Sequence, residues 1–124
     1  MSEFKINNII IPEELPAIAL KNTVLFPKLV IPIIIQRPKS IGALEFAQAH
    51  NRLVLFVTQK NSEDDIFRND LFEIGTVGRI VSVFKLPDGS SKIDVEGLIR
   101  ARITDFVAEE PFFRVNAEPM ALII

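Results

Sequence analysis

Two serines each stand beside a lysine, and these pairs are the first candidates for chemistry in the sequence. Ser40 follows Lys39, and Ser91 precedes Lys92. A lysine that accepted the hydroxyl proton of such a serine would activate it as a nucleophile. Adjacent residues of a strand, however, point to opposite faces and cannot easily share a proton. We therefore expect no Ser-Lys dyad and no catalytic residue in this chain.

The single histidine and one acidic run are the remaining candidates for a reactive or metal-binding site. His50 has no cysteine, second histidine or positioned serine near it, so we expect an idle residue in the last turn of a helix. Glu63, Asp64 and Asp65 lack the central glycine and terminal glutamate of a calcium loop. Charge runs normally face water, so this segment is expected to be a solvated loop that binds no metal.

Several motifs that would indicate an enzyme are missing. The sequence has neither a glycine-rich phosphate loop ending in Lys and Ser or Thr nor a Gly-x-Ser-x-Gly turn. It contains no cysteine, which excludes disulfides and thiolate metal sites. Hydrolysis of ATP and of peptides is therefore not encoded in these residues, and we expect no cofactor.

Size and charge narrow the class further. A length of 124 residues is typical of one domain with one hydrophobic core. The formal charge of −2 argues against nucleic-acid binding, which relies on clustered Lys and Arg. The longest apolar stretch, Leu29 to Ile35, is interrupted by Pro32 and is far shorter than the roughly 20 residues of a membrane helix. The first residues fit neither a signal nor a transit peptide, so we expect a cytoplasmic protein that binds no membrane.

The candidate residues named above must be positioned by the fold, which the sequence predicts to be mainly β with one helix, an α+β class. A run with period two or rich in β-branched residues predicts a strand, and three-residue apolar spacing predicts a helix. The six strands are expected at Leu15–Leu20, Phe26–Ile35, Leu53–Val57, Leu71–Leu86, Ser91–Phe106 and Phe112–Ala117, and the helix at Lys39–Asn51.

Prolines and glycines refine this outline. The prolines in the first two strands predict an edge strand or lead-in, then a bent strand. Pro38 suits the first turn of the helix, and Asn51 suits its C-terminal cap. The uninterrupted apolar run Leu53–Val57 predicts a strand covered on both faces.

The most regular part of the sequence is a long hairpin that turns at Pro87-Asp88-Gly89-Ser90. On its return strand, Ile93 and Val95 share one parity while Lys92 and Glu96 share the other, as in a half-buried strand. Gly97-Leu98 breaks this alternation. A glycine inside a strand predicts a bulge or a close approach of another backbone.

The order of motifs resembles the N-terminal domain of Lon proteases from about Leu15 to Glu118. Each motif is weak alone, but seven in the family's order at plausible spacings are a specific signal. The motifs are Leu15-Pro16, Phe26-Pro27-x-x-Val30-Ile31-Pro32, Lys39-Ser40-Ile41, Gln59-Lys60, Ile74-Gly75-Thr76-Val77, Leu86-Pro87-Asp88-Gly89 and Val95-Glu96-Gly97-Leu98-x-Arg100-Ala101-Arg102-Ile103.

The resemblance implies a PUA-like pseudo-barrel of about six strands with a long hairpin. It divides the chain into a lead-in (residues 1–14), the Lon N-terminal-type domain (15–118) and the start of a linker (119–124). The apolar ending from Met120 to Ile124 favours a cut in a longer chain.

The function implied by the resemblance is that of a non-catalytic module of an ATP-dependent serine protease. Such a module recognises damaged or unfolded proteins and helps to assemble a homo-hexamer. ATP and magnesium are expected only in the downstream part of such a protein. Two alternatives stay open: a stand-alone scaffold or oligomerisation protein, and an RNA-binding PUA-like domain, which the charge disfavours.

The hairpin length predicts where polypeptides bind. About ten residues on each side of the turn span roughly 33 Å, whereas a domain of this size has a radius of gyration near 14 Å. The tip is therefore expected to extend beyond the core and to expose Phe84 and Leu86 as a binding site. Phe26 and Leu29, which lie beside prolines, are further candidates for the same surface. The alternative is that all four side chains complete the core.

Overall fold

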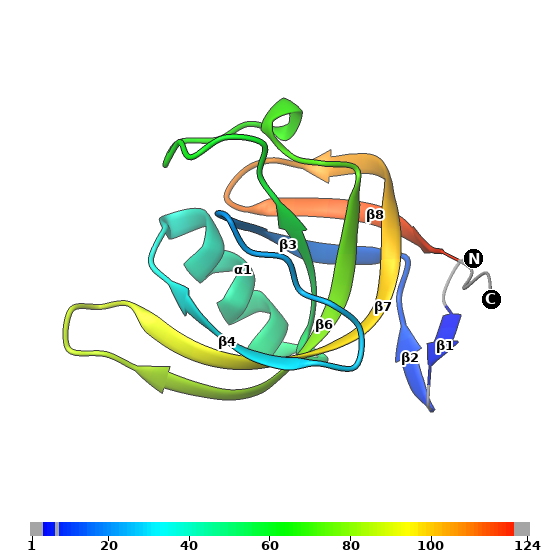
Figure 1. Ribbon diagram of the computed structural model, residues 1–124, viewed down its shortest axis with the longest axis horizontal. Helices are drawn as coiled ribbons and strands as arrows, with labels where there is room; N and C mark the ends of the chain where they lie inside the picture. Colours follow the sequence, from blue (N-terminus) through cyan, green and yellow to red (C-terminus); the bar gives the residue numbers. More distant parts are fainter. Residues whose placement is uncertain (1–3, 7, 121–124) are drawn as a thin grey trace.

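Eight strands and one α-helix form a sheet that closes on itself, in a computed structural model that describes residues 4–6 and 8–120 (Figure 1). The mainly β class with one helix is confirmed. The expected count of six strands was too low, because residues read as a lead-in form two more. The elements are β1 (Phe4–Ile6), β2 (Ile9–Ile11), β3 (Glu14–Leu20), β4 (Val30–Ile35), α1 (Pro38–Ala49), β5 (Leu53–Thr58), a 3₁₀ turn (Arg68–Asp70), β6 (Ile74–Lys85), β7 (Ser91–Ala108) and β8 (Phe113–Pro119).

The main sheet has the order β4-β7-β6-β5-β3-β8, and β8 pairs again with β7. Five strands therefore close into a barrel, and β4 is an added strand beside the first half of β7. Only β3 and β5 pair in parallel; the other pairs of this sheet are antiparallel. The strands β1 and β2 form a separate antiparallel pair, and Ile11 at the end of β2 is fully buried in the barrel core.

The prediction that Leu15–Leu20 is an edge strand or a lead-in was wrong, because β3 lies between β5 and β8. Pro16 had indicated an edge, since proline cannot donate to a ladder. The parallel pairing with β5 starts only at Ala17, so Pro16 removes no hydrogen bond on that side. The predicted central strand Leu53–Val57 is confirmed: all five residues are buried, and β5 lies between β3 and β6.

Two hydrophobic clusters explain why β3 and β5 are apolar on both faces. The cluster inside the barrel includes Ala17 and Leu55, while the cluster beneath α1 includes Ile18 and Phe56. Successive residues of a strand point to opposite faces, so each of these strands supplies both clusters. The helix adds Ala43, Leu44 and Ala47 to the second cluster.

The helix begins as predicted and ends differently. Pro38 occupies the first helical turn. The amides of His50 and Arg52 both donate to the carbonyl oxygen of Ala47 (3.1 and 2.8 Å), and Arg52 has a positive φ of 64°. Asn51 is therefore not the cap; its Oδ1 accepts a hydrogen bond from the amide of Leu53 (3.1 Å).

The long strand β7 bends at the predicted glycine. Val77 lies opposite Ile99 and Gly78 lies opposite Gly97, which leaves Leu98 as the extra residue of a bulge. Gly97 also touches the chain before β4: its amide donates to the carbonyl of Leu29, and its carbonyl accepts from the amide of Lys28, both at 2.8 Å. The expected bulge and the expected close backbone approach are both confirmed.

Figure 1 shows the tip of the β6–β7 hairpin extending past the end of β4 and past α1. The tip itself is compact, because the amide of Leu86 donates to the carbonyl of Ser90 (2.9 Å) and Asp88 accepts from the amide of Ser90 (2.9 Å). The expectation about the apolar chain end concerns mainly residues 121–124, which lie outside the described residues.

Replacing Gly97 with Ala is expected to destabilise the fold strongly. A Cβ at this position would lie 2.2 Å from the carbonyl oxygen of Phe26, so backbone must move. We expect a loss of about 3 kcal/mol in the free energy of unfolding, measured by denaturant titration. Gly89→Asn is the control, because Gly89 has a positive φ of 91° and open space around it; it should cost less than about 1 kcal/mol. Equal losses for the two variants would contradict the close approach.

Candidate functional site

None of the four side chains predicted to bind polypeptide belongs to the buried core. Phe26, Leu29 and Phe84 are 53%, 51% and 56% exposed, and Leu86 is half-buried in the hairpin tip. A large apolar side chain that stays in water is more informative than a buried one, because burial is the usual outcome. These four residues therefore remain candidates for binding.

The structure separates the four candidates into two groups. Phe84 lies in the same cross-strand row as Lys92 and Ile34, whereas Val30, which follows Leu29, lies in the row of Glu96. These rows are four residues apart, or about 13 Å at the usual strand rise. Phe84 and the segment that contains Phe26 and Leu29 therefore lie toward opposite ends of β4.

The first surface is the outward face of β4, β7 and the end of β6. Its two flanking strands expose apolar side chains: Val30 and Ile34 on β4 are 60% and 49% exposed, and Phe84 lies on β6. Directly opposite residues share a face, so Ile34 and Phe84 flank Lys92 at about 10 Å from each other. The sequence predicted Phe84 here but missed Val30 and Ile34, because it did not assign the faces of the proline-containing strand.

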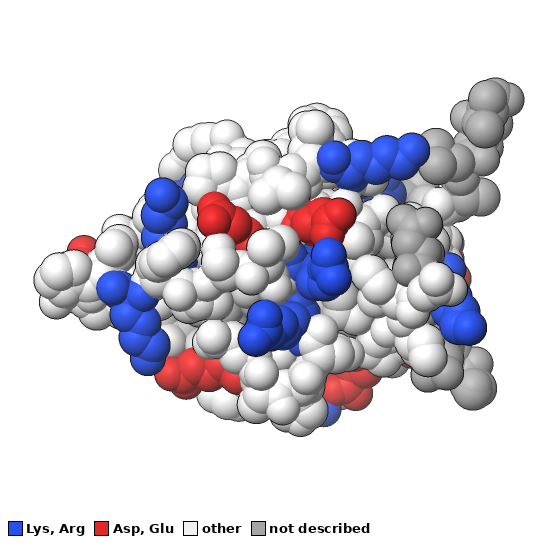
Figure 2. Space-filling model, turned by 90° about the horizontal axis from the view of Figure 1, so that it is seen from below, with Lys and Arg blue, Asp and Glu red and all other residues white. Residues whose placement is uncertain are grey.

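Charges on this side of the molecule are mixed. Figure 2, which views the molecule from below, shows Lys and Arg side chains interspersed with Asp and Glu, with wide uncharged areas between them. One ion pair on this face joins Arg79 to Glu96 (2.7 Å). The surface therefore has no strong field of one sign, and its apolar side chains are its distinguishing feature.

The second surface is a groove beside Phe26. The guanidinium of Arg100 lies 6.0 Å from the centre of the Phe26 ring, within reach of a cation–π contact. Arg100 also lines a concavity of about 680 Å³. Its exposed apolar lining is Val24, Phe72 and Ile74 (43%, 50% and 37%). These residues come from segments far apart in sequence, so no local pattern could bring them together.

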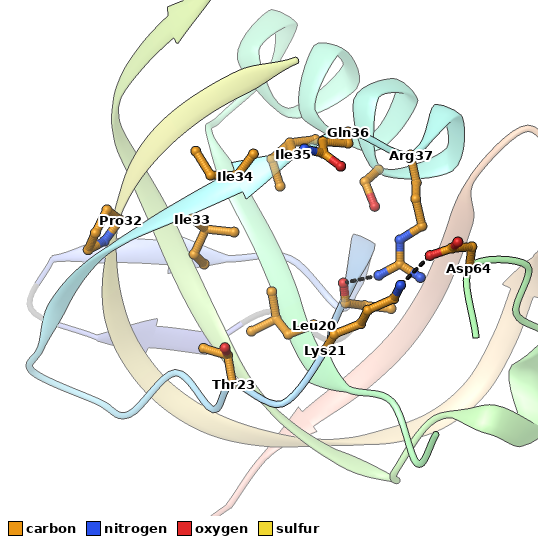
Figure 3. Close-up of a pocket in the computed structure, with 12 residues that line it drawn as sticks. Leu20, Lys21, Thr23, Pro32, Ile33, Ile34, Ile35, Gln36, Arg37 and Asp64 are labelled. Carbon is orange, nitrogen blue, oxygen red and sulfur yellow. Dashed lines mark hydrogen bonds and ion pairs between the residues drawn. The ribbon is translucent and has the colours of Figure 1, made fainter. Parts of the chain in front are cut away.

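A third feature is the gap between the open edges of β3 and β4. Figure 3 shows this cavity, of about 320 Å³, with Leu20 and Ile33 pointing into it. Arg37, just before α1, crosses one end, and its Nη2 donates to the carbonyl oxygen of Ala19 (3.0 Å). Arg37 also lines a neighbouring cavity of about 410 Å³, so its side chain lies between the two.

Charged groups gather at the same end of the gap. Lys21 forms an ion pair with Asp64, which Figure 3 shows beside Arg37. The hydrogen bond and charge of Lys21 hold the pKa of the Asp64 carboxyl below its ordinary value. Burial lowers the pKa of the Arg37 guanidinium, an effect that the charge of Asp64 partly offsets. Arg37 is thus partly desolvated while remaining a cation.

The residues considered for catalysis are engaged elsewhere. Lys39 does not face Ser40 with a free amine: its Nζ pairs with Glu110 (3.1 Å) and lies over the ring of Phe113. His50 stacks on Phe46 with ring centres 4.0 Å apart, and its Nδ1 lies 2.7 Å from the carbonyl oxygen of Phe46.

The described residues offer neither a metal-binding cluster nor a membrane-spanning helix. Within residues 4–6 and 8–120, no group of three or more His, Cys, Asp or Glu side chains is placed to hold a metal ion. No helix in this part of the chain is long and apolar enough to cross a membrane.

Residues 14–121 match the family described as the ATP-dependent protease La (LON) substrate-binding domain. The Lon protease of Vibrio parahaemolyticus is 45% identical over 106 residues, which cover 85% of this chain and 13% of that protein. The Lon protease of Escherichia coli (strain K12) is 43% identical over 106 residues, covering 85% of this chain and 14% of that protein. The chain therefore spans about one seventh of these curated relatives.

Solved structures show the same fold. The N-terminal domain of the Mycobacterium avium complex Lon protease superposes with a TM-score of 0.70 at 22% identity, covering 90% of this chain and 56% of that one. The Lon N-terminal domain protein from Xanthomonas campestris gives 0.66 at 16% identity, covering 87% and 60%. The family match and the curated relatives, taken together, establish that this chain belongs to the family of Lon substrate-binding domains.

Proposed function

We propose that this chain is the non-catalytic polypeptide-recognition module of an ATP-dependent serine protease of the Lon type, and that it captures damaged or unfolded proteins. ATP and magnesium would be used in a different part of such a protein. The four side chains predicted from sequence, Phe26, Leu29, Phe84 and Leu86, contribute to capture in this proposal. The family's description as a substrate-binding domain supports the role.

The observation that carries the proposal is the exposure of aromatic side chains. Of the nine phenylalanines whose side chains are described, Phe26, Phe67, Phe72 and Phe84 are at least half exposed, and all of these except Phe67 lie on or beside one of the two surfaces. Unfolded proteins differ from folded ones in presenting apolar side chains to solvent. Contacts between such side chains and exposed rings remove apolar area from water on both partners, which favours binding without requiring a particular sequence.

Two surfaces fit this role better than one continuous site. The outward face of β4, β7 and β6 is broad and mixed in charge, whereas the groove beside Phe26 is concave and carries Lys60, Arg100 and Arg102. An unfolded segment that contacted both surfaces would gain affinity through the second contact, because that contact is intramolecular.

The alternatives are an independent scaffold and an RNA-binding domain. The basic residues and Phe72 of the groove are the one feature that would suit RNA, since bases stack on aromatic rings. Arg102, however, is paired with Glu118 (2.6 Å), and Glu73 also lines the groove. These carboxylates reduce the positive charge available for phosphates, so we favour polypeptide.

Removing one exposed ring from each surface is expected to weaken polypeptide binding. Phe84→Ser and Phe26→Ser should each raise the Kd for an unfolded polypeptide at least about fivefold, or about 1 kcal/mol. The ligand is a labelled protein kept unfolded by reduction and carboxymethylation of its cysteines, and binding is followed by fluorescence anisotropy. Because both rings are exposed, Tm should fall by less than about 3 °C.

Phe67→Ser is the matched control for this experiment. Phe67 is 61% exposed and lines neither surface, so the Kd should stay within about twofold of the parent value. A drop in Tm large enough to show misfolding in Phe84→Ser or Phe26→Ser would mean that the ring supports the fold. Equal weakening by all three variants would argue against defined surfaces, and RNA displacing the polypeptide would favour the RNA-binding alternative.

We also propose that the full-length protein is a homo-hexamer to whose assembly this domain contributes. Interfaces in such multidomain assemblies are spread over several domains, so the 124-residue chain alone should sediment as a monomer or weak dimer at micromolar concentration. Analytical ultracentrifugation tests this directly. A stable hexamer of this chain would place the assembly contacts within it and favour the scaffold alternative.

A further inference from the structure

The strand β4 has one edge beside which no strand lies within the described residues. At its start, the carbonyl of Leu29 accepts from the amide of Gly97 on β7. Backbone groups of successive residues point to alternate sides of a strand, so the groups of Val30, Pro32 and Ile34 point away from β7. The open edge therefore offers three carbonyls but only two amide donors, because Pro32 has none.

The end of β3 has a second open edge that faces the same gap. Gln59 donates to the carbonyl of Leu20 on the β5 side, and Ala117 donates to the carbonyl of Glu13 on the β8 side. By the same alternation, the backbone N–H and C=O groups of Ala19 point to the β8 side. The β3–β8 pairing ends at Ala17 and Phe113, so Ala19 faces the gap instead.

Arg37 occupies the position where a neighbouring strand would bond to β3. Its Nη2 donates to the carbonyl of Ala19, as the amide of an added strand would do. Its Nη1 is buried and, among the described residues, has no hydrogen-bond partner. Leaving a buried charged donor unpaired costs at least as much as a lost hydrogen bond. Nη1 is therefore available to bind an acceptor that the described residues do not supply.

We propose that an extended segment of an unfolded polypeptide adds as a strand along the open edge of β4, in the gap between β3 and β4, with one of its carbonyls bound by Arg37 Nη1. This inference rests on the proposed function and specifies how the backbone of the captured chain is held. Exposed rings select apolar segments, and the edge selects segments that are extended.

The groups that line the gap fit a polypeptide backbone. Donors and acceptors on a strand edge recur every second residue, about 6.6 Å apart, which is the spacing on an incoming strand. Alternate side chains of the incoming strand would meet Leu20 and Ile33, which form an apolar floor. Backbone bonding of this kind depends little on sequence, as a module for varied unfolded proteins requires.

The test uses a peptide that favours extended structure and the 124-residue chain. The probe is an acetylated and amidated ten-residue peptide with alternating Val and Thr between terminal Lys residues. Saturating peptide should slow hydrogen exchange of the Val30 and Ile34 amides at least tenfold, followed by NMR. Ile33 and Ile35, whose amides face β7, serve as internal controls and should change less than twofold.

Methylated peptides and an arginine variant separate backbone pairing from apolar contact. N-methylation of one alternate set of peptide amides should raise the Kd at least tenfold, and methylation of the other set should raise it less than threefold. Arg37→Met should raise the Kd at least fivefold. Arg114→Met is the matched control, since Arg114 pairs with Glu14 and lines none of the cavities described above; its Kd should stay within twofold.

The outcomes distinguish the two proposals. If neither this peptide nor the carboxymethylated protein binds, the proposed function fails and the strand addition fails with it. If they bind while the Val30 and Ile34 amides stay unprotected, or both methylated sets bind equally, only the strand addition is overturned. If Arg37→Met proves unfolded by its thermal transition, the methylated peptides and the exchange data decide alone.

Discussion

The contact between Gly97 and the chain before β4 is the constraint on which both halves of the sheet depend. The first residues of strand β7 pair with β4 and β6, and its last residues pair with β6 and β8. The strand must therefore bend between these two sets of partners. The bulge at Leu98 supplies the bend, and the missing side chain at Gly97 lets the segment from Phe26 to Leu29 bond to it. Without that approach the start of β4 would lose two backbone hydrogen bonds to β7, which would weaken the attachment of Val30 and of the outward face at this end.

Much of this arrangement follows from local sequence patterns. The alternation of Ile93 and Val95 with Lys92 and Glu96 defines the inner and outer faces of β7, and Gly97-Leu98 marks its bulge. The error came from a residue type with two physical meanings. Pro16 and Pro32 both suggest an edge strand, yet among the described residues only β4 has an open edge along its whole length; β3 pairs with β8 over its first residues and with β5 over its last, and Pro16 precedes the pairing with β5. The gap was beyond prediction, since Ala19, Arg37 and Asp64 are brought together only by the path of the whole chain.

The exposed phenylalanines carry an energetic cost that a binding role accounts for. Burying a Phe side chain fully contributes about 1.5–3 kcal/mol relative to leaving it in water, so Phe26, Phe72 and Phe84, each about half exposed, contribute only part of this to folding. The fold is maintained by two separate clusters, one inside the barrel and one beneath α1, which together bury both faces of β3 and β5. If the exposed rings bind polypeptide as proposed, stability and apolar recognition draw on different residues, and the binding surface can stay solvated without weakening the core.

A surface that binds unfolded chains, as we propose for this one, must also avoid binding copies of itself, and two features of the open edges oppose such self-association. An unprotected edge strand pairs readily with an identical one, since each presents unpaired amide donors and carbonyl acceptors to the other. Pro32 removes the central donor of β4, and Arg37 already occupies the carbonyl of Ala19 on β3. On the outward face, Lys92, Asp94 and Glu96 run between the apolar side chains of β4 and Phe84, so two such faces would bring charges into contact. A flexible chain can adjust its backbone to the missing donor at Pro32, to Arg37 and to the charged row, whereas a second rigid copy cannot. These features therefore favour binding of an unfolded chain over self-association.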